Sequence, residues 1–225
     1  MATTRLQLSN AALMIIGERA LVTLNDATEA RRKLDDVWNN AGVLRCLEKG
    51  LWRFATRTSQ LTYDQNITTS FGYANAFPKP TDWVKTVNVA QDEFFQQPCL
   101  RYSDEQGYLY ADLTQLYVRY VSSDSNYGLN MALWTGAFTE MAEMYFASRV
   151  VRKLTNDDKK AALIQDPENP QKGWLPQAII NARNLDAWAD AVKFSARGNW
   201  VNSRIRNGAN SGSWNDMGNQ NQLIG

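Results

Sequence analysis

From residue 70 to residue 87 the chain reads SFGYANAFPKPTDWVKTV, a stretch that decides the fold because it cannot be helical. Pro78 and Pro80 fix their own φ angles and push the residue before each of them out of the helical region. The backbone therefore has little freedom left where it enters a strand, expected over residues 84–89. Helical patterns lie on both sides of the stretch. The stretch at residues 70–87 therefore indicates a shaped surface inserted in a helical protein. It contains no nucleophile and base that could act together.

Short apolar alternations extend the β pattern to either side. They occur at residues 52–63, 84–90, 99–103, 107–112 and 115–122. Apolar residues alternate in these segments with a period of two, and the segments are rich in Tyr, Val, Phe and Thr. Both features favour strands. The sequence Asp-Glu-Gln-Gly at residues 104–107 is typical of a hairpin turn. We therefore expect residues 52–127 to form an antiparallel β insertion.

The insertion is rich in tyrosine, which raises the possibility of a stacking platform for bases or sugars. The residues concerned are Tyr102, Tyr108, Tyr110, Tyr117 and Tyr120. Such platforms are usually accompanied by a run of Arg and Lys, which the insertion lacks. The pattern favours sheet core and subunit contact instead.

Two helices are expected before the insertion. Apolar residues at helical spacing between residues 8 and 16, with Gly17 at the position of a C-cap, predict a short first helix. Asp26, with Glu29 as its capping-box partner, predicts the start of a second helix. An apolar stripe then continues to Gly50, so this helix should be about 23 residues long.

Further helices are expected after the insertion. The clearest runs over residues 129–154, with cations at Arg149, Arg152 and Lys153 near its C-terminus, where the helix dipole favours them. Thr155 followed by Asp158 predicts a restart through residue 164. Pro176 opens a final helix that should direct its apolar residues toward the core. They are Ile179, Ile180, Ala182, Leu185, Trp188, Ala189 and Val192.

These patterns predict an α+β protein. A bundle of about four helices, expected to pack on one another, would be formed by residues 1–51 and 128–193. Residues 52–127 would be the β insertion. Residues 194–225 are rich in Asn, Gly and Ser and predict an extended C-terminal arm, because such a segment buries too little apolar surface to order itself.

The arm carries widely spaced aromatic and cationic side chains. Trp200 and Trp214 are its aromatic anchors, and Arg204 and Arg206 supply charge. Sparse Trp and Arg residues on a disordered segment commonly dominate binding to a partner. The other interpretation is a tail that binds nothing.

Composition excludes several classes of function. The 225 residues include no histidine, which removes the usual catalytic triads, histidine-containing zinc sites and a simple pH switch. The formal net charge of +1 gives no strong attraction to nucleic acid or to an anionic membrane. The apolar run at residues 11–16 is far shorter than the roughly 18 residues of a membrane span. Cys46 and Cys99 match no metal or redox spacing and predict buried free thiols in a reducing compartment.

Only carboxylate or lysine chemistry would remain for an enzyme. The candidate pairs are Asp35 with Asp36, Asp104 with Glu105, Glu140 with Glu143, and Asp157 with Asp158. Adjacent residues of a helix or strand point apart, and Glu140 and Glu143 share a helix face that a solvated or intersubunit ion-pair role explains. We therefore expect no catalytic site, no cofactor and no metal.

Several motifs together resemble the head-to-tail adaptor proteins of tailed phages, and most closely the tail tubular protein A family of short-tailed phages. The similarity spans residues 5–190. It is carried by NAAL at residues 10–13, IGE at 16–18, GLWRFA at 50–55, YA at 73–74, FPKPTDW at 77–83, LWTGAF at 133–138 and MA at 141–142. The long Asn- and Gly-rich C-terminus departs from the family pattern.

The resemblance implies a structural virion protein. Twelve copies would form a ring in the tail, below the portal protein and above the tail nozzle protein, assembled in the host cytoplasm and leaving a channel for DNA passage. The partners would be other copies, portal and nozzle, with tail fibres as a further candidate, and with no sequence-specific DNA binding and no membrane contact. Trp200, Arg204, Arg206 and Trp214 are the candidate portal-binding residues. The alternatives are a receptor- or carbohydrate-binding virion module that uses the tyrosine-rich sheet and, third, a lysozyme-like hydrolase.

Overall fold

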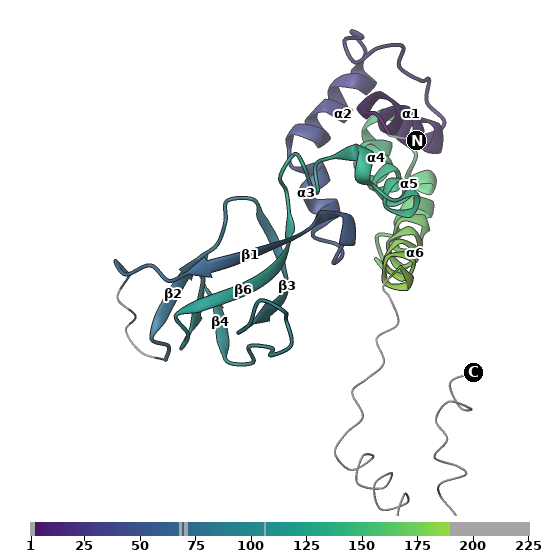
Figure 1. The fold of residues 1–225 in the computed structure, drawn as a ribbon. Helices are drawn as coiled ribbons and strands as arrows, with labels where there is room; N and C mark the ends of the chain where they lie inside the picture. The colour runs from purple at the N-terminus through teal and green to yellow at the C-terminus, as the bar shows by residue number, and fades with distance from the viewer. Residues whose placement is uncertain (1–2, 68, 70–71, 106, 190–225) are drawn as a thin grey trace, which may run out of the picture. The chain divides into compact units, whose positions relative to one another are not determined.

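The computed structural model describes residues 3–67, 69, 72–105 and 107–189 (Figure 1). These ranges contain six α-helices, two short 3-10 helices and six strands, joined by turns and loops. The helices are α1 (Arg5–Ile16), α2 (Glu29–Asn39), α3 (Gly42–Leu47), η1 (Arg53–Ala55), η2 (Met131–Leu133), α4 (Gly136–Thr155), α5 (Asp158–Ile164) and α6 (Trp174–Trp188). The strands are β1 (Thr56–Thr62), β2 (Asn75–Pro78), β3 (Trp83–Ala90), β4 (Tyr102–Glu105), β5 (Tyr108–Ala111) and β6 (Gln115–Ser122). The predicted α+β class is confirmed.

The first helix follows its sequence signals. Thr4 and Gln7 form a reciprocal capping box at the start of α1, in which the Gln7 amide donates to Thr4 Oγ1 over 3.3 Å. Gly17 ends the helix with a φ of 78°, a left-handed conformation that glycine adopts at little cost. The predicted helix and its C-cap are confirmed.

The expected long second helix is wrong, because the chain breaks it between α2 and α3. Thr28, not Asp26, caps α2, and the Asp26 carboxylate instead accepts hydrogen bonds from the turn before it. Ala41 then adopts a φ of 60°, and the Cβ of any larger residue at Gly42 would lie 2.5 Å from the Val37 carbonyl oxygen. The break turns α3 so that most of its side chains are buried in the helical core.

Helix α4 is central to the helical core. It begins at Gly136, later than the predicted start at residue 129, because Asn130 caps η2 and Thr135 caps α4 itself. Its buried face includes Phe138, Met141 and Phe146, and helices α1, α2, α5 and α6 all contact it (Figure 1). Helices α2 and α3, which precede the β strands, thus contact α4, which follows them.

The last two helices differ from prediction at their starts. Thr155 ends α4, and Asp157 caps α5 by accepting from the Lys159 and Lys160 amides. Helix α6 begins at Trp174, so Pro176 lies in its first turn. Proline is tolerated there because the first amides of a helix have no partner within the helix.

The predicted inward face of α6 is wrong in its C-terminal half. Ile180, Leu185 and Trp188 are exposed, Trp188 by 78%. Leu175 and Ala182 are buried, while Ile179 is partly buried against the core. The predicted core residue at position 192 lies outside the described residues. An apolar stripe thus remains uncovered by the described part of the chain.

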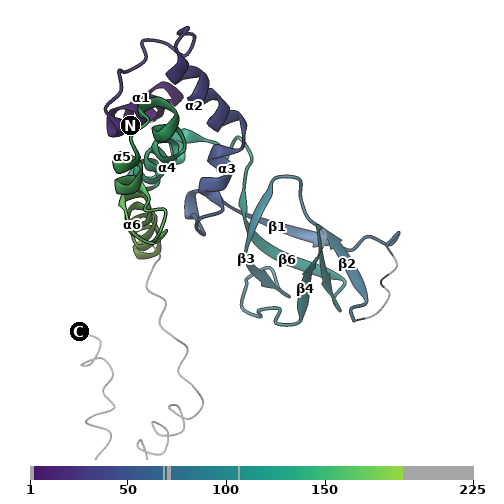
Figure 2. The ribbon, with the colours of Figure 1, turned by 180° about the vertical axis from the view of Figure 1, so that it is seen from behind.

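The strands form two three-stranded antiparallel sheets, ordered β1-β6-β3 and β2-β5-β4 (Figure 2). Each of the five predicted strand segments overlaps one strand, β1, β3, β4, β5 or β6 in that order. The expected hairpin joins β4 and β5, with Glu105 opposite Tyr108. Residues 53–55 form η1 where a strand was expected. Strand β2 was not expected because it ends in Pro78, which an edge strand tolerates.

The sheets enclose a core of their own. Phe77, Leu109, Leu116 and Tyr120 are fully buried in it. Val121, at the end of β6, is buried in the helical core instead, so one strand contributes to both cores. None of the described helices is long and apolar enough to cross a membrane. The boundaries of the bundle, insertion and arm stay predictions.

Candidate interaction surfaces

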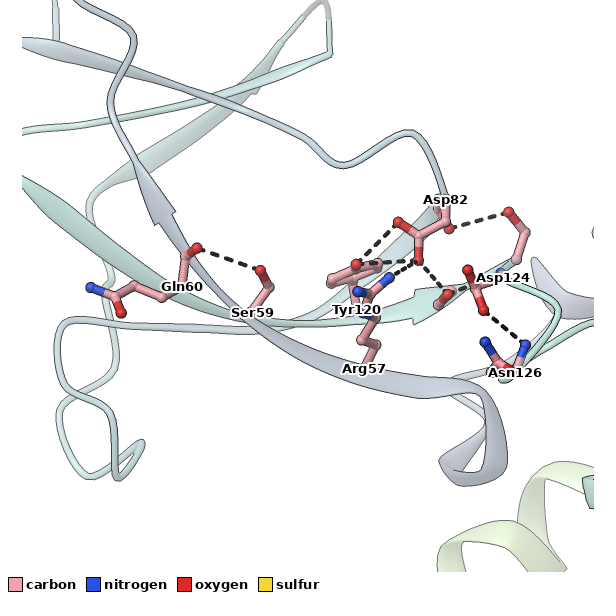
Figure 3. A network of polar contacts seen from close by, with 9 residues as sticks. Arg57, Ser59, Gln60, Asp82, Tyr120, Asp124 and Asn126 are labelled. Atoms are coloured by element: carbon pink, nitrogen blue, oxygen red, sulfur yellow. Dashed lines mark hydrogen bonds and ion pairs between the residues drawn. The ribbon is translucent and has the colours of Figure 1, made fainter.

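The densest polar network of the β region surrounds Asp82, which follows the two prolines of the deciding stretch (Figure 3). Its carboxylate accepts hydrogen bonds from Arg57 Nη1 at 3.0 Å, Tyr120 Oη at 3.2 Å and Ser122 Oγ at 2.5 Å. The backbone carbonyl of Asp82 accepts from the Ser123 amide at 2.8 Å. One residue therefore ties β1, the entry to β3 and the end of β6 together.

The electrostatics of this network favour a charged aspartate. Burial would raise the pKa of Asp82, but hydrogen bonds from Ser122 and Arg57 outweigh it and hold the pKa below its ordinary value. Burial and the nearby Asp82 charge raise the pKa of Tyr120 to about 12. Tyr120 therefore stays a neutral donor, and the network is a structural anchor.

Aromatic stacking extends this anchor. The rings of Trp83 and Tyr120 stack with centroids 4.3 Å apart, and Lys79 Nζ lies 5.5 Å from the Trp83 ring centre. The sequence motif at residues 77–83 thus contributes a packed strand junction, a role that its prolines alone did not indicate.

The candidate carboxylate pairs do not form paired sites. Asp35 accepts from Arg5 and Arg31, while its neighbour Asp36 is exposed. Asp157 caps α5, and Asp158 lies 3.4 Å from Arg152. In the hairpin, Asp104 pairs with Lys79, and Glu105 accepts from Ser103.

Glu140 and Glu143 lie on one face of α4, as predicted. Burial, and then the charge of Glu140, raise the pKa of Glu143. Neither carboxylate has an ion-pair partner among the described residues. No group of three or more Cys, Asp and Glu side chains in the described ranges is arranged to hold a metal ion.

Both predicted free thiols are buried. Burial raises the pKa of the Cys46 thiol to about 12 and also raises that of Cys99. These thiols are therefore poor nucleophiles at neutral pH, because the thiolate is the reactive form.

The five tyrosines of the insertion do not share one surface. Tyr120 is fully buried, and Tyr117 projects from the opposite face of β6. Tyr108 and Tyr110 remain together on β5, half-buried, with ring centroids 6.3 Å apart.

A groove over α3 and α4 is lined by several cations. It consists of two adjoining hollows of about 350 and 660 Å³, and Arg45, Tyr145, Ser148 and Arg149 line both. We call the two hollows together the basic groove. Their other cationic lining residues are Lys33, Lys49, Arg152, Lys153 and Arg183.

The charge of the basic groove is poorly compensated. Asp36 and Glu48 are the acidic residues in its lining. Arg45, Arg149 and Lys153 form no ion pair with any described residue. The near-neutral charge of the chain therefore conceals a local excess, because these cations come from helices far apart in sequence. In the sequence, only Arg149, Arg152 and Lys153 near the end of α4 form a recognisable cluster of cations.

The wall of the larger hollow is apolar. Leu175, Pro176, Ile179 and Ile180 of α6 form it. The groove thus offers cationic and apolar contacts side by side, a combination that suits a protein segment better than a bare phosphate chain.

The predicted portal-binding residues Trp200, Arg204, Arg206 and Trp214 lie outside the described residues. No protein-family model matches the chain, and a search of curated proteins finds no match either.

Proposed function

We propose that this chain is a structural virion protein, a head-to-tail adaptor whose copies form a ring between the portal and the tail nozzle and leave a channel for DNA. Twelve copies is the stoichiometry that the resemblance implies. The α+β class and the uncovered apolar face of α6 support the proposal. An adaptor subunit needs several contact surfaces and no catalytic site.

One observation carries the proposal. Two of the motifs that resemble the adaptor family, at residues 50–55 and 133–138, meet in one aromatic cluster around Phe138. The Phe138 ring lies 4.9 Å from Trp52, 4.8 Å from Phe54 and 4.9 Å from Trp134, all edge to face. Trp52 Nε1 donates to the Leu47 carbonyl at 2.9 Å, which ties the same cluster to α3. Two motifs that lie far apart in the sequence thus share one structural role, which supports the proposal.

The proposal assigns a different partner to each part of the subunit. The helical bundle and the C-terminal arm would contact the portal, the β insertion would contact the nozzle, and lateral packing would close the ring. A ring of this kind uses two different surfaces of each subunit. We expect isolated subunits to be largely monomeric, because the portal supplies the template on which they gather.

Deleting residues 198–225 tests the portal contact. The truncated protein should melt like the full chain, since none of the deleted residues belongs to a predicted core stripe. Portal attachment should weaken by several orders of magnitude, because the Trp200 and Trp214 anchors contribute roughly 2 kcal/mol or more each. Co-sedimentation with portal measures the effect, and unchanged binding would contradict the role of the arm.

A carbohydrate- or receptor-binding module is the second candidate. Tyr108 and Tyr110 favour it, because two adjacent half-buried rings could stack on a sugar. Glycan binding by isolated subunits, lost in Tyr108→Ala with Tyr110→Ala and retained in Tyr117→Ala, would favour this function over the ring.

A further inference from the structure

Arg45, Arg149 and Lys153 of the basic groove have no ion-pair partner among the described residues, but the β region offers a matching surface. Between β3 and β4, residues 91–97 form a short turn that we call the acidic loop. The Gln91 amide donates to the Gln97 carbonyl at 2.9 Å, which closes the loop. The Asp92 carboxylate accepts from the Gln96 amide at 3.0 Å and the Gln97 amide at 2.7 Å.

The acidic loop is held in one conformation. Phe95 has a φ of 57°, and its ring lies 4.1 Å from the Arg119 guanidinium carbon. Because the turn is already fixed by hydrogen bonds and this cation–π contact, docking would order little additional chain. A preformed turn of this kind is suited to insertion into a groove.

The tip of the loop presents a carboxylate next to an aromatic ring. Glu93 is exposed and has no ion-pair partner among the described residues, and Phe94 is 71% exposed. Exposed aromatic side chains are frequent anchors of protein interfaces. The pair therefore combines the two chemistries that the basic groove offers.

We propose that the acidic loop of one copy docks in the basic groove of the next copy. Glu93 is placed against Arg45 and Arg149, and Phe94 against the α6 wall at Ile179 and Ile180. The loop and the groove are different surfaces of the same chain, so the contact is heterologous, the kind that forms a ring when the rotation between copies closes. The inference rests on the proposed ring and names its lateral contact.

Charge argues against two other occupants. Residues 190–225 of the same chain carry four cations, Lys193, Arg197, Arg204 and Arg206, against Asp190 and Asp216, so a positive groove repels them on balance. A nucleic acid would match the cations and leave the apolar wall of the groove without a contact.

Cross-linking between two variants, each with one introduced cysteine, tests the contact. Gln91→Cys places a thiol on the loop, and Gln171→Cys places one in the groove lining; both positions are exposed. The native thiols are buried, so a short bis-maleimide should react with the introduced ones. Mixing the two proteins in the presence of portal, the template on which copies gather, should give a 91–171 heterodimer, with little product when only one of the two variants is present.

Charge reversal then identifies the contact. Glu93→Lys in the loop protein, or Arg149→Glu in the groove protein, should each lower the yield of heterodimer about tenfold, as expected for loss of one close charge pair. Combining both reversals should restore much of the yield. The matched controls Glu168→Lys and Arg32→Glu change the same charges at exposed positions outside the loop and groove and should leave the yield unchanged.

Each outcome separates the contact from the ring. Rings on portal without a 91–171 product would overturn the lateral contact alone. A 91–171 product that responds to charge reversal, without rings on portal, would support the contact and contradict the adaptor function. Binding of double-stranded DNA that is lost in Arg149→Glu, with no cross-link, would assign the groove to nucleic acid and overturn the inference.

Discussion

The helical core and the β core are held together by different interactions. In the helical core, Phe138 is surrounded by three aromatic rings edge to face, and the stabilising contacts are apolar. In the β region, a smaller apolar core is joined to a charged anchor, Asp82, that receives three side-chain donors. The helical core should therefore respond most to a lost ring, and the β region also to the loss of a charge.

The largest expected effect is Phe138→Ala. Removing a buried ring from a packed cluster leaves a cavity, and such changes cost about 3–5 kcal/mol. Urea denaturation followed by tryptophan fluorescence measures it, with exposed Phe94→Ala as the matched control. A cost equal to that of the control would show that the aromatic cluster does not hold the helices together.

The next effect is Asp82→Asn, which keeps the shape of the side chain but removes its charge. Hydrogen bonds to charged groups contribute about 1.5–3 kcal/mol, so the free energy of unfolding should fall by that order. Asp36→Asn, at an exposed position, is the control.

The Asp82 anchor also predicts a pH dependence. Because the pKa of Asp82 is lowered in the folded protein, its contribution is present in full above the ordinary value of 3.8 and is lost as the pH falls through the lower folded value. Thermal melts between pH 3 and 7 should show this loss in the wild type, and a reduced one in Asp82→Asn. If the melting temperatures of the wild type and Asp82→Asn depended on pH in the same way, the role of Asp82 as an anchor would be contradicted.

A smaller effect is expected at the break between α2 and α3. Ala41→Gly should stabilise the protein by about 0.5–1 kcal/mol, because glycine adopts a positive φ without the strain of a Cβ. Gly42→Ala should destabilise it, since the added Cβ would meet the Val37 carbonyl oxygen. Chemical denaturation of both variants checks the signs, and a destabilised Ala41→Gly would indicate a continuous helix.

The smallest effect concerns Glu140→Gln combined with Glu143→Gln. Burial raises the pKa of Glu143, so its contribution to stability is full below the ordinary value of 4.5 and is lost as the pH rises through the higher folded value. Near pH 7 the double variant should change stability by no more than about 0.5 kcal/mol. Loss of a hydrolytic activity in this variant would contradict the structural role.

Local signals predicted the elements they act on directly. The apolar spacing and C-cap Gly17 of α1, the α4 stripe and the β4–β5 hairpin are all short-range features. The break at Ala41 was not predictable, because alanine rarely adopts a left-handed conformation and tertiary packing imposes it here.

The interaction surfaces were harder to predict. The exposed face of α6 has the same apolar pattern as a buried face, so periodicity alone does not distinguish them. The basic groove joins Arg45 with Arg149, which only the fold brings together. Nothing in the sequence indicated that Phe94 would be exposed, because its exposure depends on the conformation of the closed loop at residues 91–97.

Negative-stain imaging of the purified protein mixed with its portal tests the adaptor function most directly. We predict portals capped by a ring of this protein with an open central channel, and no rings when the portal is omitted. Portals that stay bare while the protein remains a discrete monomer would contradict the proposed function.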